Sequence, residues 1–157
     1  MNLLQPRNGT ATSLSQAISV ANDIGYPLVV RPSYVLGGRA MEVVYGEEDL
    51  KRYFAEAVKV SNKSPVLLDK FLDHATEIDV DAVADGKDVV IGGIMEHIEE
   101  CGVHSGDASC VLPPYHLKTG QIERITKISK ELGLALDVKG LVKEQLAIRE
   151  GKNYFIE

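Results

Sequence analysis

The pattern of hydrophobic and polar positions changes character about 65 residues into the chain. Before that point, apolar residues recur every three or four positions over residues 11–25 and 46–61, which predicts two amphipathic helices. Thr12 or Ser13 can cap the first helix, and Gly25 can end it. Apolar stretches at residues 26–32 and 40–45 predict two strands with a glycine-containing loop between them.

After this point the pattern is mostly that of strands. The pattern predicts strands within residues 65–72, 75–100 and 106–114, with a turn at Asp85-Gly86 inside the second stretch. A helix follows over residues 118–136, with Thr119 as its predicted cap, and a hairpin around Gly151 ends the chain. We therefore expect an α+β fold, with a small helix-and-strand lobe at residues 1–65 and a larger antiparallel sheet lobe with helices at residues 66–157.

Composition and charge narrow the class of protein. Hydrophobic residues make up 45% of the chain and charged residues 25%, which is typical of a globular domain. The net charge is -6 and no basic cluster is present, so we expect no nucleic-acid partner. No apolar run reaches the ~18 residues of a membrane span, and the first residues do not resemble a signal peptide. Cys101 and Cys110 lack metal-ligand spacing, and we expect reduced thiols in a cytoplasmic protein.

Polar and apolar residues alternate strictly along residues 77–84, which predicts a strand with one apolar and one acidic face. The apolar face consists of Ile78, Val80, Ala82 and Ala84, and the acidic face of Glu77, Asp79 and Asp81. Such an acidic face is most often solvated. One of its carboxylates could instead accept hydrogen bonds from a ribose, although the alternation does not select which one.

The loop "VLGGRAM" places Gly37 and Gly38 between two strands, with Arg31 before it and Arg39 within it. Glycine lets main-chain N–H groups approach an anion closely, and arginine adds positive charge and forked donors. A flap that closes on a phosphate is one interpretation. An ordinary hairpin with two solvated arginines is the other, and the spacing alone favours it.

Gln145 and Glu157 lie on the two predicted strands of the last hairpin. A three-residue loop at 150–152 would place them directly opposite each other, with Cβ atoms ~5 Å apart, where their oxygens could share a Mg²⁺ ion. A two-residue loop would put them on opposite faces. An exposed polar face of an ordinary hairpin remains the alternative to a metal site.

Several motifs together are specific enough to identify a family. The stretches "YPLVVRPSYVLGGRAME", "PVLLDKFLDHATEIDVDAV", "IGGIMEHIEECGVHSGDASC", "GLVKEQLAI" and "YFIE" resemble carbamoyl phosphate synthetase large subunits, from about Gln5 to Glu157. This resemblance implies part of an ATP-grasp fold in an ATP-dependent ligase. The flap "GGRAME" and the loop "GVHSGD" resemble the second of the family's two homologous halves, which phosphorylates carbamate to carbamoyl phosphate.

The resemblance also implies roles for individual residues. Arg31 would contact the ATP phosphates and act in catalysis, beneath the flap at Gly37 and Gly38. The remaining ATP-binding residues would be Asp69, Lys70 and Leu72 at the adenine, Glu77 at the ribose, and Gly102, Val103, His104, Ser105, Gln145 and Glu157. Gln145 and Glu157 would hold Mg²⁺ or Mn²⁺. The residues implied for a K⁺ ion are Glu77, His97, Glu99, Val103 and Ser105.

The family's enzymes use glutamine or ammonia, bicarbonate and two ATP, and they serve arginine and pyrimidine biosynthesis. The implied partners are the remainder of the large subunit, a glutaminase small subunit and the carbamate intermediate. The chain stops at Glu157, where the family continues with Asn-Pro-Arg or a close variant. We therefore expect a fragment that is inactive alone and self-associates through exposed apolar surface. The alternatives are another ATP-grasp carboxylate ligase or carboxylase, and a non-catalytic nucleotide-binding module.

Overall fold

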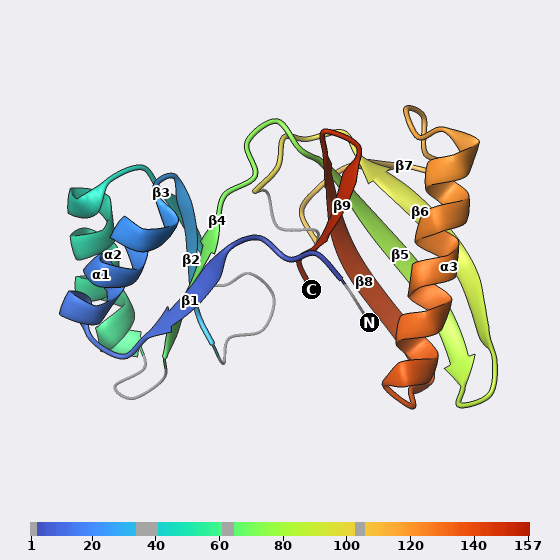
Figure 1. Ribbon diagram of the computed structural model, residues 1–157, viewed down its shortest axis with the longest axis horizontal. Helices are drawn as coiled ribbons and strands as arrows, with labels where there is room; N and C mark the ends of the chain where they lie inside the picture. Colours follow the sequence, from blue (N-terminus) through green and yellow to red (C-terminus); the bar gives the residue numbers. More distant parts are fainter. Residues whose placement is uncertain (1–2, 34–40, 61–64, 103–105) are drawn as a thin grey trace. The chain divides into compact units, whose positions relative to one another are not determined.

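A computed structural model describes residues 3–33, 41–60, 65–102 and 106–157, and it confirms the expected α+β class (Figure 1). The helices are α1 (Leu14–Ile24), α2 (Glu47–Val60) and α3 (Thr119–Ala135). The strands are β1 (Asn8–Ala11), β2 (Leu28–Pro32), β3 (Glu42–Val44), β4 (Val66–Lys70), β5 (Thr76–Asp85), β6 (Val89–His97), β7 (Cys110–Val111), β8 (Lys139–Arg149) and β9 (Lys152–Phe155). The chain forms two compact units, Gln5–Leu72 and Asp73–Glu157, and the second also includes the N-terminal residues through Leu4.

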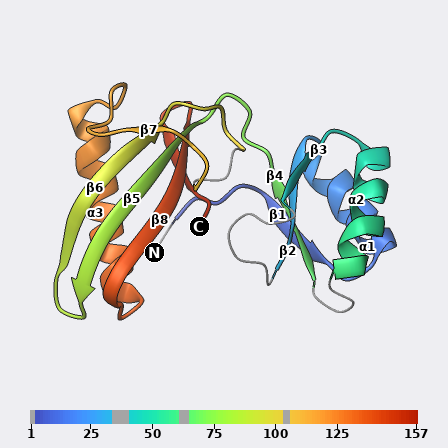
Figure 2. The same cartoon turned by 180° about the vertical axis from the view of Figure 1, so that it is seen from behind.

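The first unit is a four-stranded antiparallel sheet in the order β1-β4-β2-β3, with α1 and α2 on one face (Figures 1 and 2). Alternate residues of the strands point toward these helices, as Leu28, Val30 and Leu68 do, and they are fully buried. The helices contribute Ala17, Ala21, Ile24, Leu50, Tyr53 and Phe54 to the same core. The opposite face of β2 carries Arg31, which is only partly buried.

The predicted limits of α1 are confirmed. The Ser13 hydroxyl accepts a hydrogen bond from the main-chain N–H of Gln16, and Gly25 ends the helix with φ 85°. Strand β1 was not predicted, because "NGTA" contains residues that are depleted in strands and shows no clear alternation. Its pairing with β4 completes the sheet.

The division between the two units differs from the expected boundary at residue 65. Strand β4 lies after that boundary, yet it pairs with both β1 and β2 and is central in the first sheet. The first unit therefore extends to Leu72. The change in composition near residue 65 marks where strands become frequent, whereas unit membership depends on which strands pair.

The second unit is a five-stranded antiparallel sheet in the order β7-β6-β5-β8-β9, and α3 covers one of its faces (Figures 1 and 2). The predicted apolar face of β5 is buried as expected. This core contains Ile78, Val80, Ile94, Ile125, Leu146, Ile148 and Phe155, with Ile122, Ile128 and Leu132 of α3 packed against it. The acidic face of β5 therefore lies on the side of the sheet away from α3.

Two local predictions in this unit have different outcomes. The Asp85-Gly86 turn is confirmed, since Asp85 Oδ1 accepts from the N–H groups of Lys87 and Asp88 at 2.8 Å and Gly86 has φ 87°. Thr119 as the cap of α3 is wrong. Lys118 occupies the cap position, and Oε1 of Gln121 accepts a hydrogen bond from its main-chain N–H at 3.0 Å.

None of the helices within the described residues combines the length and the hydrophobicity that crossing a bilayer requires.

Candidate functional site

The last hairpin has a two-residue loop, Glu150-Gly151, with Arg149 paired to Lys152. Both loop residues have positive φ, 52° and 74°, as a type I′ turn requires. The three-residue alternative is therefore wrong. The regular register by itself would place Gln145 opposite Ile156, one residue short of Glu157.

A β-bulge at the end of the hairpin nevertheless brings Gln145 opposite Glu157. The Gln145 carbonyl oxygen accepts hydrogen bonds from the N–H groups of both Ile156 and Glu157, at 2.9 and 3.3 Å. The Gln145 N–H in turn donates to the Glu157 carbonyl oxygen at 2.8 Å. Ile156 and Glu157 thus both lie opposite the single residue Gln145, which defines a bulge. The pair that the sequence singled out as candidate metal ligands is held together by two main-chain hydrogen bonds.

The acidic face of β5 is not the solvated face that the alternation suggested. Asp81 is exposed, but Glu77 and Asp79 are 5% and 2% exposed. Side chains from β6 and β8 and the segment after β6 contact these two carboxylates. Burial of an acidic group is costly unless hydrogen bonds or charges compensate it, so the contacts of Glu77 and Asp79 define the site.

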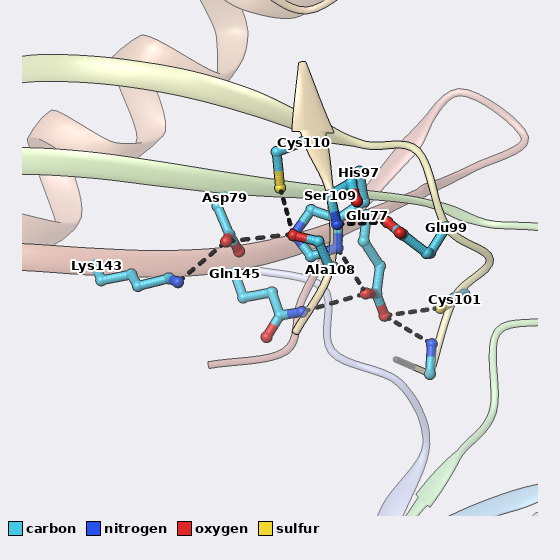
Figure 3. Close-up of polar contacts among 11 residues, drawn as sticks. Glu77, Asp79, His97, Glu99, Cys101, Ala108, Ser109, Cys110, Lys143 and Gln145 are labelled. Atoms are coloured by element: carbon cyan, nitrogen blue, oxygen red, sulfur yellow. Dashed lines mark hydrogen bonds and ion pairs between the residues drawn. The ribbon is translucent and has the colours of Figure 1, made fainter. Parts of the chain in front are cut away.

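Glu77 uses both of its carboxylate oxygens (Figure 3). Oε1 accepts hydrogen bonds from the Cys101 thiol at 3.0 Å and from the Gly102 N–H at 3.2 Å. Oε2 accepts from Nε2 of Gln145 at 3.3 Å and lies 3.3 Å from Nδ1 of His97. Glu77 therefore ties the segment after β6 to strand β8 and to the candidate metal ligand Gln145.

His97 lies between two carboxylates. Its Nδ1 faces Glu77, and its Nε2 lies 3.3 Å from Oδ2 of Asp79. The same Asp79 oxygen is 3.0 Å from Nζ of Lys143, which reaches it from β8 (Figure 3). The side chains of His97, Glu77 and Asp79 are 1%, 6% and 3% exposed, so these three groups form a buried network, while Lys143 is half-exposed.

Cys101 and Glu99, both on the segment after β6, have shifted pKa values. Burial, and then the hydrogen bond to the negative Glu77, raise the pKa of the Cys101 thiol. Cys101 is thus a protonated donor and a poor nucleophile. The exposed carboxylate of Glu99 accepts from the Ser109 N–H at 2.6 Å, and hydrogen bonding by Ser109 lowers the pKa of Glu99.

The first unit places the other predicted ATP-binding residues around strands β2 and β4. Nε of Arg31 is 3.7 Å from Oδ2 of Asp69 across the pair β2–β4, on the face away from the helices. The ammonium of Lys70 donates to the carbonyl oxygens of Gly25 and Tyr26 at 3.0 and 2.7 Å. Leu72 is buried. The two hydrogen bonds of Lys70 tie the end of β4 to the loop after α1.

Two groups of predicted site residues lie outside the described residues: Gly37 and Gly38 with Arg39 of the glycine loop, and Val103, His104 and Ser105. Gly102 is described, and its main chain faces Glu77. Asp79 and Lys143 were not singled out as site residues. The alternation pattern could have pointed to Asp79, because it places Asp79 on the same face as Glu77. The structure adds that Asp79 is paired with Gln145 across β5 and β8.

Comparisons with known proteins agree on the fold. Among solved structures, biotin carboxylase from Campylobacter jejuni in complex with β,γ-ATP matches 99% of this chain and 36% of its own, with a TM-score of 0.83 at 20% sequence identity. D-alanine-D-alanine ligase from Helicobacter pylori matches 99% of this chain and 48% of its own, with a TM-score of 0.78 at 16% identity. The chain thus has the ATP-grasp fold.

Sequence comparison identifies the family as well as the fold. The carbamoyl phosphate synthase large chain of Vibrio parahaemolyticus is 57% identical over all 157 residues, which span 15% of that relative. The C-terminal section of the Aquifex aeolicus large chain is 54% identical, and the match spans 29% of it. The present chain is therefore much shorter than these relatives. Residues 2–157 match the family model of the carbamoyl-phosphate synthase L chain, ATP binding domain, and the chain belongs to this family.

Proposed function

We propose that this chain is the ATP-binding region of the carbamate-phosphorylating half of a carbamoyl phosphate synthase large chain. Its similarity to the C-terminal section of the Aquifex aeolicus protein supports the assignment to the second half. The observation that carries the proposal is the opposed pair Gln145 and Glu157, which would supply two oxygen ligands for a metal ion bound to ATP.

Glu77 would orient one of these ligands. Because Nε2 of Gln145 donates to Glu77, the amide oxygen of Gln145 is the atom left for Mg²⁺ or Mn²⁺. The carboxylate of Glu157 would complete the pair. A metal ion held this way would neutralise phosphate charge during transfer. This role for Glu77 is compatible with a contribution to ribose binding.

A monovalent cation site would lie beside this pair. The residues are Glu77, His97, Glu99, Val103 and Ser105. K⁺ prefers oxygen ligands, so His97 would contribute its main-chain carbonyl, because both ring nitrogens face carboxylates. Such an ion would offset part of the negative charge of Glu77 and Glu99.

The other predicted residues would supply the remaining contacts to the nucleotide. Arg31 would bind the phosphates, and the glycine loop with Gly37 and Gly38 would close over them. Asp69, Lys70 and Leu72 would hold the adenine, while Gly102, Val103, His104 and Ser105 would contribute from the second unit. The terminal phosphoryl group of ATP would pass in line to a carbamate oxygen, with ADP leaving, and no covalent enzyme intermediate is required.

In this proposal, the other steps of carbamoyl phosphate synthesis are carried out by the whole large chain. Its partners would be the rest of that chain and a glutaminase subunit, and its product would enter arginine and pyrimidine biosynthesis. The free thiols Cys101 and Cys110 support a reducing, cytoplasmic setting.

The test is Arg31→Ala in the full-length large chain. We expect the carbamate-dependent reaction, measured as ATP formation from carbamoyl phosphate and ADP, to fall on the order of 10²-fold, because a charge at the transferring phosphate is lost. Bicarbonate-dependent ATP hydrolysis should be nearly unchanged. Arg7→Ala is the matched control, since Arg7 forms an exposed ion pair with Asp23. Equal loss of both reactions would contradict the assignment to the second half.

A further inference from the structure

We propose that Asp79, His97 and Cys110 form a binding site for a transition-metal cation of the Zn²⁺ class, separate from the metals linked to ATP. One ligand atom from each residue, a carboxylate oxygen, an imidazole nitrogen and the thiol sulfur, lies within 4.8 Å of the others. Figure 3 shows the three side chains converging from β5, β6 and β7.

Strand pairing explains why these residues meet. Cys110 of β7 is the direct partner of His97 of β6, so their side chains lie on the same face of the sheet. Asp79 lies on the neighbouring strand β5, on the face that also carries Glu77. Three rigid strands thus hold the three donors, which limits the cost of assembling a metal site.

Two polar atoms of these residues are buried without a hydrogen-bond partner among the described residues: Oδ1 of Asp79 and Nε2 of His97. Both side chains are more than nine-tenths buried. Nε2 is 3.3 Å from Oδ2 of Asp79, but the pair does not have hydrogen-bond geometry. A cation at this point would satisfy both atoms, whereas leaving them unpaired costs free energy.

A metal ion at Nε2 requires the neutral imidazole with its proton on Nδ1. Nδ1 faces Oε2 of Glu77, so a proton on Nδ1 leaves the lone pair on Nε2 for the cation. A carboxylate behind a histidine ligand is a common arrangement in zinc sites. The competing occupant is a proton on Nε2, which would make His97 an imidazolium between two carboxylates.

The donor set selects the class of metal. Thiolate and imidazole suit borderline ions such as Zn²⁺ and Co²⁺, while Mg²⁺ and K⁺ prefer oxygen. Lys143 contacts Oδ2 of Asp79, which leaves Oδ1 for the ion. Cys110 is exposed, so the fourth position would be open to water, as in zinc sites with three protein ligands.

The thiol must lose its proton when the ion binds. A divalent ion would replace that proton, so binding should release it to the solvent.

The experiment is a Co²⁺ titration of the chain after treatment with a chelator. We expect a near-ultraviolet thiolate-to-cobalt charge-transfer band that saturates at one Co²⁺ per chain and disappears when Zn²⁺ is added. Cys110→Ser should abolish the band and weaken Zn²⁺ binding, measured by calorimetry, by at least about tenfold. Cys101→Ser is the matched control, because it removes the other thiol, and it should retain the band.

Cys110 is exposed on a short edge strand, so the Cys110→Ser variant should fold, and circular dichroism checks this. Absence of the band in the unmodified chain would overturn the proposal. So would a band that survives Cys110→Ser or is lost only in Cys101→Ser. Nucleotide binding plays no part in these measurements, so their failure would leave the proposed function untouched.

Discussion

The main-chain N–H of Gln145 donates to the carbonyl oxygen of Glu157 at 2.8 Å, and the N–H of Glu157 donates back at 3.3 Å. The hairpin loop alone would misalign these residues by one position. The bulge at Ile156 corrects the alignment. A local irregularity of one residue therefore decides whether the two candidate metal ligands face each other.

Replacement of Glu157 by alanine should weaken Mg²⁺-dependent ATP binding. In the full-length large chain, we expect Glu157→Ala to lower the affinity of this half for Mg²⁺·ATP by about tenfold or more, because a metal ligand is lost. Isothermal titration measures the affinity. Glu150→Ala is the control, since Glu150 lies in the exposed loop of the same hairpin. Unchanged affinity in Glu157→Ala would argue against a metal at this pair.

The Glu77→Gln substitution should destabilise the chain, because Glu77 accepts hydrogen bonds at both oxygens in a buried position. The amide has the same shape but supplies one acceptor oxygen fewer, so a buried donor loses its partner. We expect the free energy of unfolding, measured by urea denaturation, to fall by about 1–3 kcal/mol. Asp81→Asn on the exposed end of the same face should change it by less than about 0.5 kcal/mol. Equal effects of the two substitutions would contradict the buried network.

Glu144 should make stability depend on pH. It lies on β8, 4% exposed, and neither carboxylate oxygen has a hydrogen-bond partner among the described residues. Burial raises the pKa of Glu144, and the nearby Ser129 hydroxyl acts in the opposite direction. The folded chain therefore keeps Glu144 protonated at pH values above the pKa that Glu144 has in the unfolded chain. The free energy of unfolding decreases as the pH rises through the pKa of Glu144 in the folded chain.

The Glu144→Gln substitution should remove this penalty. We expect it to raise the free energy of unfolding by about 1 kcal/mol at pH 8 and by less at pH 5, because an amide needs no deprotonation. Urea denaturation at the two pH values measures the difference. Glu123→Gln, on the exposed side of α3, should show no pH-dependent gain. A gain for Glu144→Gln that is larger at pH 5 would rule out this assignment.

Two glycines of α3 should respond oppositely to alanine. A Cβ atom on Gly120 would meet nothing within 4 Å, so Gly120→Ala should raise the free energy of unfolding by up to about 1 kcal/mol through helix propensity. A Cβ atom on Gly133 would lie 3.0 Å from Cγ2 of the buried Val89. We expect Gly133→Ala to lower the free energy of unfolding by about 1 kcal/mol.

A double-mutant cycle separates the steric effect from helix propensity. In a Val89→Ala background the obstructing methyl groups are gone, so Gly133→Ala should become favourable, as Gly120→Ala is. Thermal or urea denaturation of the four variants measures the coupling. Additive effects would show that Val89 does not limit the space at Gly133.

The sequence by itself determined most of the local structure and the family. Helical spacing predicted all three described helices, the Asp85-Gly86 pair predicted its turn, and alternation assigned the two faces of β5. These features depend on neighbouring residues, so they can be read locally. The motifs that resemble the family are long and ordered, which explains why the family and its fold were both predicted correctly.

Tertiary structure decided what those faces do. Alternation shows that Glu77 and Asp79 share a face, but their burial depends on His97, Cys101 and Lys143, which come from other strands and from the segment after β6. Likewise β1 forms only because β4 offers it an edge, and Gln145 meets Glu157 only through a bulge. Non-local pairing and desolvation set these outcomes, and neither is encoded in a local pattern of residue types.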